Sequence, residues 1–517
     1  MKLYNPKSRS GLAIKSLIKL KILVLIFLTS SILGCKKILQ VPAPLNSVNG
    51  ENVYTSDQTA IQAITAIYAS LSDDNLNIRV NYYSSFFFFA GLSADELELY
   101  DRNYLDWFAF YSNTLSPNSG PGASYWTSTY SLIFRANAGI QGLSASKTLS
   151  PGIRNQLLGE ALFLRAYSYF FLVNTYGDIP LITGTDPNIN RLIGRTSSVE
   201  VYKQIIKDLI EAQGLLGNNF LEGDLKTSKS STPRVRPTKW VAKALLARVN
   251  LYAGNYSDAV LEATGVINNN TQFKLEELSN VFLNNSQEVI WGLQSVGNDS
   301  NSGFNAGESR LILPATGPGT SGVDGIYLSD FVLNSFEAGD GRKSSWVGTI
   351  TTSTGKVFSY ANKYKAPRTQ INNTESHVEF RLAEQYLIRA EANAQLKNIS
   401  EAVLDLNILR NRARLLPSIA IPNPLPPLSS SLTGVDLLKA IEHERQIELF
   451  TENGHRWFDL KRTSGFTNPS LTRADEVLPI VSRAKGTTWN NFAKLFPIPE
   501  SDLSANPNLT GHQNPGY

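Results

Sequence analysis

Flat aromatic rings and hydrogen-bonding side chains alternate over one short stretch of this chain, and together they could hold a small ligand. The stretch contains Tyr100, Asn103, Tyr104 and Trp107. A sugar ring presents an apolar C–H face and a rim of hydroxyl groups, so a site for it needs aromatic platforms beside amide, carboxylate or guanidinium groups. The four residues meet that requirement, and they suit core packing equally well. Both interpretations are compatible with the sequence.

Other aromatic segments differ in their polar surroundings. Phe304, Tyr327 and Trp346 lie in a segment rich in Gly, Ser, Asn and Thr, and we include them as additional ligand-contact candidates. The run Phe86–Phe89 contains no polar side chain, which favours packing in the core.

Catalytic groups in a familiar arrangement are absent from the sequence. His443-Glu444 begins as a zinc-protease helix does, but Ile447 stands where the second histidine should be. The Gly-x-Ser-x-Gly and Gly-Lys-Ser/Thr motifs are missing. Asp95 and Glu96 are adjacent carboxylates, and neighbours on a helix point about 100° apart, so we expect a solvated or capping role for them. We therefore predict a protein that is not an enzyme and needs no cofactor, and we assign no metal ligands.

A dense group of charges lies near the end of the chain. It spans Glu442–Phe450 and continues, after a turn at Gly454, through His455–Asp459. Ile441, Arg445 and Glu448 share one helical face. We predict a buried ion-pair network that fixes the last helix to the helical repeats.

The first residues have the features of an export signal. Six cationic residues and no acidic one precede an apolar stretch from Ile22 to Leu33, and Gly34-Cys35 follows. That stretch is shorter than the ~20 residues of a membrane-spanning helix. Cys35 is the only cysteine and lies where a lipoprotein signal peptidase would cut, so we predict a signal peptide over residues 1–34 and a lipid anchor on Cys35. An ordinary signal with a chance cysteine is the alternative.

Removal of the signal changes what the charge implies. The formal net charge of +4 becomes −2 without the six cationic residues before Cys35. The basic balance of the whole chain therefore gives no reason to expect a nucleic-acid partner. A single cysteine also excludes an internal disulfide and a cysteine-based metal site.

Helical periodicity dominates the rest of the chain after a tether over residues 35–50. Apolar residues recur at helical spacing in seven segments: 58–71, 124–143, 159–176, 199–216, 239–253, 379–396 and 400–413. Another helix should follow the turn at Gly254-Asn255-Tyr256. The helix pairs around Asn255 and Asn398 match at an offset of 143 residues, which suggests tetratricopeptide-like repeats. Two unrelated antiparallel helix pairs are the alternative.

These segments predict a mainly α architecture in one domain over 51–517, with helical hairpin repeats and large irregular, loop-rich insertions. The repeats occupy about 51–283 and 374–462. The insertions lie at about 76–123 and 284–373, where we place ligand binding because long insertions in a compact domain are usually functional or disordered. A C-terminal segment covers 463–517.

Four stretches, in order along the chain, resemble the SusD/RagB family of outer-membrane lipoproteins from Bacteroidetes. They are Cys35–Leu39, Gly159–Tyr167 with Tyr176–Leu181, Glu442–Phe450 with His455–Arg462, and Leu495–Pro499 with Asn514–Tyr517. The resemblance covers nearly the whole mature chain. It implies four tetratricopeptide-like helix pairs with an irregular ligand-binding part.

The resemblance also implies a function. Such proteins bind nutrient, usually oligo- or polysaccharide, and act as a lid on a SusC-like TonB-dependent transporter, held on the outer membrane by lipid and facing the cell exterior. The alternatives are a helical scaffold lipoprotein without a ligand, or a binder of peptides or other non-glycan nutrients. One departure bears on orientation: Lys36 and Lys37 follow the cysteine where surface-exposed relatives usually carry acidic residues.

Overall fold

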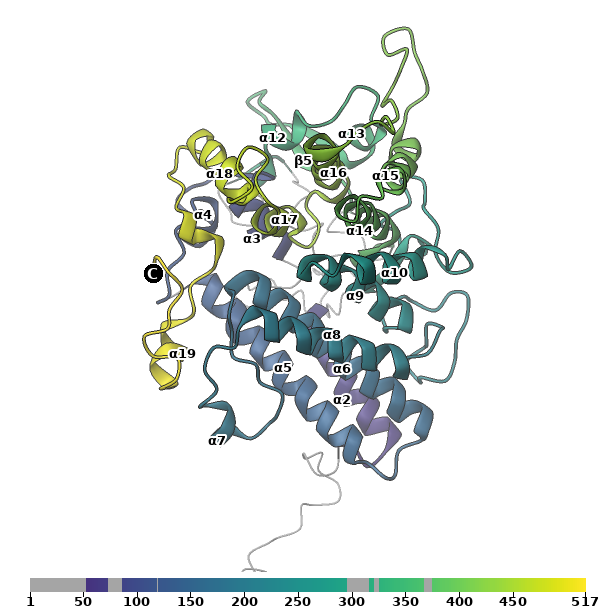
Figure 1. Cartoon of the computed structure of the whole chain (residues 1–517), viewed down its shortest axis with the longest axis vertical. Coiled ribbons are helices and arrows are strands. Elements are labelled where there is room, and N and C mark those ends of the chain that lie inside the picture. The colour runs from purple at the N-terminus through teal and green to yellow at the C-terminus, as the bar shows by residue number, and fades with distance from the viewer. Residues whose placement is uncertain (1–52, 73–85, 119, 295–315, 320–324, 367–373) are drawn as a thin grey trace, which may run out of the picture. The chain divides into compact units, whose positions relative to one another are not determined.

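The first four long helices lie side by side in the lower part of Figure 1. The computed structural model describes residues 53–72, 86–118, 120–294, 316–319, 325–366 and 374–517. The predicted signal peptide, Cys35 and the tether lie outside the described residues. The four helices are α2 (Asp57–Ser72), α5 (Pro121–Ala145), α6 (Pro151–Tyr176) and α8 (Ser198–Leu215).

Helix α6 packs against both α5 and α8 and is buried along almost its whole second half. A helix covered on several sides has no need for a polar stripe, which explains its nearly continuous apolar and aromatic sequence. The predicted helix over 159–176 is confirmed. It begins earlier than expected, at Pro151, because the fixed φ of proline suits the first helical turn.

Two helix hairpins follow, and their turns have the same backbone geometry. The first consists of α9 (Lys239–Ala253) and α10 (Tyr256–Ile267), and the second of α14 (Leu382–Gln395) and α15 (Ile399–Ala413). Gly254 and Lys397 occupy corresponding positions in the two turns. Both adopt left-handed backbone conformations, with φ values of +79° and +68°.

The same pair of asparagine hydrogen bonds closes each hairpin. The backbone N–H of Asn255 donates to the Asn250 carbonyl (2.8 Å), and its side-chain amide donates to the Asn250 side chain (3.2 Å). Asn398 makes the same two bonds to Asn393, at 2.8 and 3.1 Å. The predicted repeat at an offset of 143 residues is therefore confirmed at the level of individual contacts.

Further helices complete the described chain. The remaining helices are α3 (Phe86–Ser93), α4 (Leu105–Tyr111), α7 (Pro187–Asn190), α12 (Asp330–Leu333), α13 (Gly341–Trp346), α16 (Gly434–Leu449), α17 (His455–Arg462), α18 (Arg473–Ala484), α19 (Glu500–Ala505) and the 3₁₀ turn η4 (Asn491–Lys494). The mainly α fold class is confirmed. None of the helices in the described ranges is long and apolar enough to cross a bilayer.

Three antiparallel strand pairs join segments of the irregular insertions to each other and to the helices. The pairs are β1 (Leu97–Leu99) with β3 (Ile326–Leu328), β2 (Val289–Leu293) with β6 (His377–Arg381), and β4 (Val347–Thr351) with β5 (Val357–Ala361). The β-like run Val289-Ile290-Trp291 is thus confirmed as a strand. The β1–β3 pair is the one that joins the two predicted insertions.

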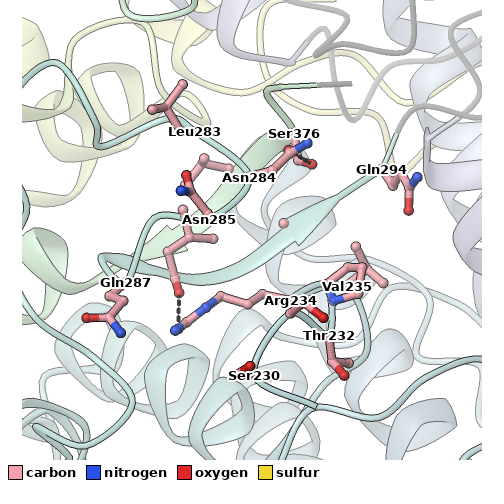
Figure 2. A pocket seen from close by; sticks show the side chains of 15 residues that line it. Ser230, Thr232, Arg234, Val235, Leu283, Asn284, Asn285, Gln287, Gln294 and Ser376 are labelled. Carbon is pink, nitrogen blue, oxygen red and sulfur yellow. Dashed lines mark hydrogen bonds between the residues drawn. The ribbon is translucent and has the colours of Figure 1, made fainter. Parts of the chain in front are cut away.

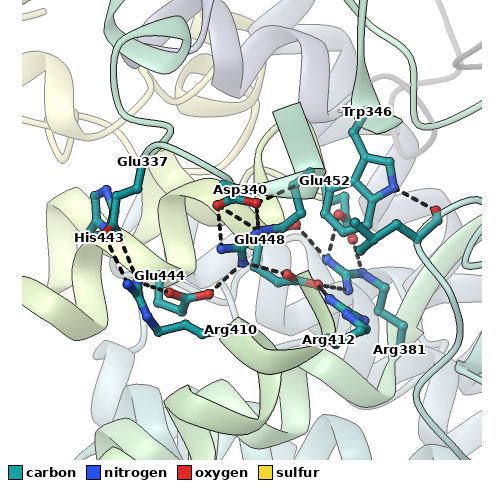
Figure 3. A network of polar contacts seen from close by, with 12 residues as sticks. Glu337, Asp340, Trp346, Arg381, Arg410, Arg412, His443, Glu444, Glu448 and Glu452 are labelled. Atoms are coloured by element: carbon teal, nitrogen blue, oxygen red, sulfur yellow. Dashed lines mark hydrogen bonds and ion pairs between the residues drawn. The ribbon is translucent and has the colours of Figure 1, made fainter. Parts of the chain in front are cut away.

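Buried ion pairs hold the second insertion on the late helices, as Figure 3 shows. Arg342 pairs with Asp340 (2.7 Å), Glu444 (2.5 Å) and Glu448 (2.9 Å), and all four side chains are fully buried. Arg381 on β6 pairs with the same Glu448 at 2.6 Å. Removal of one member of such a network leaves an uncompensated buried charge, so these pairs fix the insertion firmly.

A second set of ion pairs joins the last part of the charged segment to a repeat. Arg445 pairs with Asp459 at 2.7 Å, and Arg462 pairs with Glu391 on α14 at 2.6 Å. The predicted network that fixes helix α17 to the repeats is confirmed.

Asp95 and Glu96 correct one expectation, because neither carboxylate is solvated. Both are buried, Asp95 in a pair with Arg456 at 2.7 Å and Glu96 as acceptor of the Thr451 backbone N–H at 3.0 Å. Their partners come from the other end of the chain, so local helical geometry could not have indicated them.

Candidate aromatic binding surface

The β1–β3 pair brings together two aromatic candidates from separate insertions. Its register places Glu98 opposite Tyr327, and the backbone N–H of Tyr100 donates to the Gly325 carbonyl at 2.8 Å. The rings of Tyr100 and Tyr327 both meet the ring of Phe358 on β5 edge-on, with centroids 5.7 and 5.0 Å away. Phe358 is buried, whereas 46% of Tyr100 is exposed. Tyr100, Tyr327 and Phe358, with the neighbouring loop up to Tyr104, form what we call the aromatic surface.

The loop between β1 and α4 contributes exposed groups. Asn103 is exposed, and its backbone and side-chain N–H groups both donate to Asp101 at 3.0 Å. Tyr104 is 37% exposed and touches Trp107 at a centroid distance of 5.0 Å. Asn103 and Tyr104 therefore lie where a ligand can reach them.

Trp107 lies in the core rather than on the surface, which corrects its assignment as a contact residue. It is 1% exposed and packs edge-on against Phe88 with a centroid distance of 4.5 Å. On α4 the ring turns inward, while Leu105, two residues earlier, faces solvent. The buried ring of Trp107 packs against the exposed ring of Tyr104 and holds it in place.

Trp346 is also buried and cannot present a ring face to a ligand in this fold. Its indole N–H donates to the Leu278 carbonyl at 2.9 Å, and the cations of Lys363, Arg381 and Arg412 lie 4.8 to 5.8 Å from its ring centre. The side chain is part of the buried network in Figure 3. The Gly-rich sequence around Trp346 suggested an exposed ring, because the residues that bury it come from other segments of the chain.

Polar groups surround the exposed tyrosines. The guanidinium of Arg102 lies 5.3 Å from the ring centre of Tyr111, whose hydroxyl donates a short hydrogen bond to Glu98. Burial, and then the charge of Glu98, raise the pKa of Tyr327 above its ordinary value of 10. Burial, and then the hydrogen bond to Glu98, raise the pKa of Tyr111. The Tyr327 phenol therefore stays protonated at neutral pH and can donate a hydrogen bond to a ligand, whereas the buried Tyr111 phenol already donates its proton to Glu98.

Phe358 and Lys356 were missed by sequence reasoning. Lys356 lies 4.7 Å from the ring centre of Phe358, on the same strand region. The alternation Val357-Phe358-Ser359-Tyr360 is the only local signal, and it indicates a strand without indicating what the strand faces. Phe304, another aromatic of this insertion, lies outside the described residues.

A separate pocket of about 360 Å³ lies beside β2 and is lined mostly by hydroxyl and amide side chains (Figure 2). Its one charged side chain, Arg234, already donates to the backbone carbonyls of Val289 (2.7 Å) and Gln272 (2.8 Å). None of the residues that line it in the described chain is aromatic. The aromatic surface therefore meets the requirement for a ring-shaped, hydroxylated ligand better than this pocket does.

Two side chains of types that often act in catalysis, His455 and Asp95, are buried in structural contacts. Burial, and then the charge of Arg248, lower the pKa of His455 well below its ordinary value, so its ring is neutral. Asp95 is occupied by Arg456. Across the described ranges, no three His, Cys, Asp or Glu side chains are grouped as metal ligands.

Comparison with known proteins finds similarity along most of the chain. A family model described as the SusD family matches residues 347–517, and one described as "Starch-binding associating with outer membrane" matches residues 92–251. SusD-like protein P2 of Formosa agariphila is 28% identical over 95% of this chain and 98% of its own length. SusD-like protein P38 of the same organism is 26% identical over 86% and 91%.

Solved structures share the fold. A SusD superfamily protein from Bacteroides vulgatus has a TM-score of 0.71 and 20% identity, covering 90% of this chain and all of its own. Surface glycan-binding protein A from Bacteroides uniformis has a TM-score of 0.71 and 19% identity, covering 89% of this chain and 99% of its own.

Proposed function

This chain belongs to the SusD family, and from that premise we propose that it binds oligo- or polysaccharide at the aromatic surface without cleaving it. We propose further that it is a lipid-anchored outer-membrane protein that passes the glycan to a SusC-like TonB-dependent transporter, for which it acts as a lid.

The convergence of Tyr100 and Tyr327 is the observation that carries the proposal. Two tyrosine rings from separate insertions meet one buried phenylalanine, and Tyr100 keeps nearly half of its surface free. Exposed apolar side chains that lie together mark binding sites, whereas single exposed ones are normal. Arg102, Asn103 and Lys356 supply hydrogen-bond donors beside them, which matches the alternation of C–H faces and hydroxyl groups in a sugar chain.

The relatives support the ligand class. One matching family model is described as starch-binding, and the Bacteroides uniformis protein with the same fold is named a surface glycan-binding protein. A scaffold role without a ligand would leave the exposed tyrosines unexplained, whereas a peptide ligand would also use them and is separated from a glycan by the titration described below.

The proposal that the protein does not cleave its ligand has a physical basis. Hydrolysis of a glycosidic bond needs two carboxylates ~5–9.5 Å apart on either side of the bond. Asp95 and Glu96 are buried, and Asp95 is held by a buried arginine. Release of reducing sugar from a bound polysaccharide by the pure protein would overturn this part of the proposal.

Membrane attachment and orientation rest on the sequence alone. Cys35 would carry the lipid, and replacing it with alanine should release the protein from membranes and abolish incorporation of labelled palmitate. Because Lys36 and Lys37 follow in place of acidic residues, attachment facing the periplasm is the alternative. Protease treatment of intact cells distinguishes the two orientations, since only an outward-facing protein is degraded.

Calorimetry against glycans tests the central proposal. The purified chain without its signal peptide is titrated with starch, other neutral polysaccharides, acidic polysaccharides and mixed peptides. Heat with at least one glycan is expected. Heat with none of the glycans and none of the peptides would favour the scaffold, and heat with peptides alone would favour a peptide binder. Affinity purification from detergent-solubilised membranes should recover a TonB-dependent barrel if the lid role holds.

A further inference from the structure

Three aromatic residues stand at four-residue intervals on helix α5. Trp126, Tyr130 and Phe134 share one face, because residues four apart are neighbours on a helix. Trp126 is buried, Tyr130 is partly covered and Phe134 is 51% exposed. The stripe therefore runs from the core to solvent and ends in an exposed ring.

The stripe lines a cavity of about 300 Å³ whose lining is mostly apolar. Four polar residues, which we call the polar wall, also line this cavity: Asn190 and Arg191 at the end of α7, and Asp502 and Asn506 in and directly after α19. The volume lies at the lower end of the ~300–1,000 Å³ of typical ligand pockets, which suits one sugar unit better than a long chain.

Two charged groups of this wall have spare hydrogen-bonding capacity. The guanidinium of Arg191 makes no hydrogen bond or ion pair with the part of the chain that the structure describes. The carboxylate of Asp502 accepts only from its neighbour Ser501, at 3.2 Å, among the described residues. By contrast, the Tyr130 hydroxyl already donates to the Pro180 carbonyl at 2.9 Å. The wall therefore offers a strong donor and a strong acceptor with no net charge.

We propose that this pocket is a second glycan-binding site, which takes one pyranose unit of a neutral saccharide. The C–H face of the sugar lies on the ring of Phe134, and its hydroxyl groups bond to Asp502 and Arg191. The inference rests on the proposed glycan binding, but it uses none of the residues of the aromatic surface. An apolar side chain of a partner protein would fit Phe134 as well, but it would make no hydrogen bond to Asp502 or Arg191.

Calorimetry with trisaccharides tests the second site. The probes are maltotriose, cellotriose, xylotriose, laminaritriose and mannotriose, and the one that binds the wild-type protein best is used with each variant. Wild type should bind two molecules per chain. Phe134→Ala and Tyr327→Ala should each keep one site at the wild-type affinity and weaken the other. Phe492→Ala, which removes a ring of similar exposure (54%) outside the pocket, should still bind two.

Asp502→Asn provides a variant that keeps the shape of the pocket. Its carboxylate has only the bond from Ser501 to lose, so the protein should fold normally, as circular dichroism and thermal unfolding can show. We expect binding at the second site to weaken at least tenfold. A 4-fluorophenylalanine at position 134 gives a local readout, since its ¹⁹F resonance should shift when the trisaccharide is added.

The outcomes separate the two proposals. Unchanged stoichiometry and affinity in both Phe134→Ala and Asp502→Asn, with a loss in Tyr327→Ala, overturn the second site and leave the aromatic surface standing. A fluorine resonance that does not move at saturating trisaccharide has the same meaning. A wild-type protein that binds none of the glycans contradicts the proposed function and the second site together.

Discussion

Tyr327 lies directly opposite Glu98 in the β1–β3 pair, although the two residues belong to insertions far apart in the sequence. The pairing places Tyr327 beside Tyr100, which follows β1, and both rings rest on Phe358. The binding surface thus combines three segments, two of which are joined by this short ladder. The buried ion pairs around Arg342 and Arg381 hold the second insertion in the position that this ladder requires.

Alanine replacement of Tyr100 or Tyr327 should weaken glycan binding. Each ring contributes an exposed contact face, so we expect a loss of about 1–2 kcal/mol, or roughly 5–30-fold in Kd. Calorimetry with the best-binding glycan measures the change. Phenylalanine at either position keeps the ring and should retain most of the affinity. Wild-type affinity in both alanine variants would remove the aromatic surface from consideration.

Trp107→Ala should act through stability. The ring is buried against Phe88 and Tyr104, so its removal is expected to lower the free energy of unfolding by about 3–5 kcal/mol. Urea unfolding measures this loss. Leu105→Ala on the same helix is the control, because Leu105 is exposed and should change stability by less than about 0.5 kcal/mol. Equal stability of the two variants would show that Trp107 is not a core residue.

Glu96 should make stability fall as pH rises. Burial, and then the charge of Asp95, raise the pKa of Glu96 from 4.5 to about 8. Between these values the folded protein keeps a proton that the unfolded chain has released. This contribution is complete below pH 4.5 and is lost by about 1.4 kcal/mol per pH unit up to the folded pKa.

Glu96→Gln tests this dependence, because glutamine is neutral in both states. Urea unfolding at pH 5, 6, 7 and 8 should show a steeper decline for wild type than for the variant. The variant should be the more stable of the two near pH 8. Parallel curves for the two proteins would mean that Glu96 is ionised in the fold.

The hairpin turns predict opposite effects of two matched substitutions. Lys397→Gly should stabilise the protein by about 0.5–1 kcal/mol, because a side chain in the left-handed region is strained and glycine is not. Gly254→Lys should destabilise it by a similar amount. A Cβ at Gly254 would meet no atom within 4 Å, so the second change tests the backbone alone. Chemical unfolding gives both values, and shifts of the same sign would contradict a shared turn geometry.

Local patterns predicted the repeat and most helix bounds correctly, but the helix expected over 379–396 begins only at Leu382, because residues 379–381 belong to β6, which pairs with β2. The helix Lys239–Ala253 and the turn after it were evident from apolar spacing and from Gly254, because a helix and its end are set by interactions within a few residues. The match between Asn250–Asn255 and Asn393–Asn398 was visible for the same reason. The charge density of Glu442–Phe450 correctly indicated a buried network, since so many charges on one helix require partners.

The sequence by itself therefore determined the helical scaffold, the repeated hairpins and the aromatic residues from which a site could be built. The tertiary structure alone decided which of those aromatics reach solvent. Tyr100 and Tyr327 meet through a strand register that no local signal specifies, whereas Trp107 and Trp346 turn into the core. The physical reason is that exposure depends on segments far apart in the chain, and these are brought together by strand pairing and buried ion pairs rather than by local periodicity.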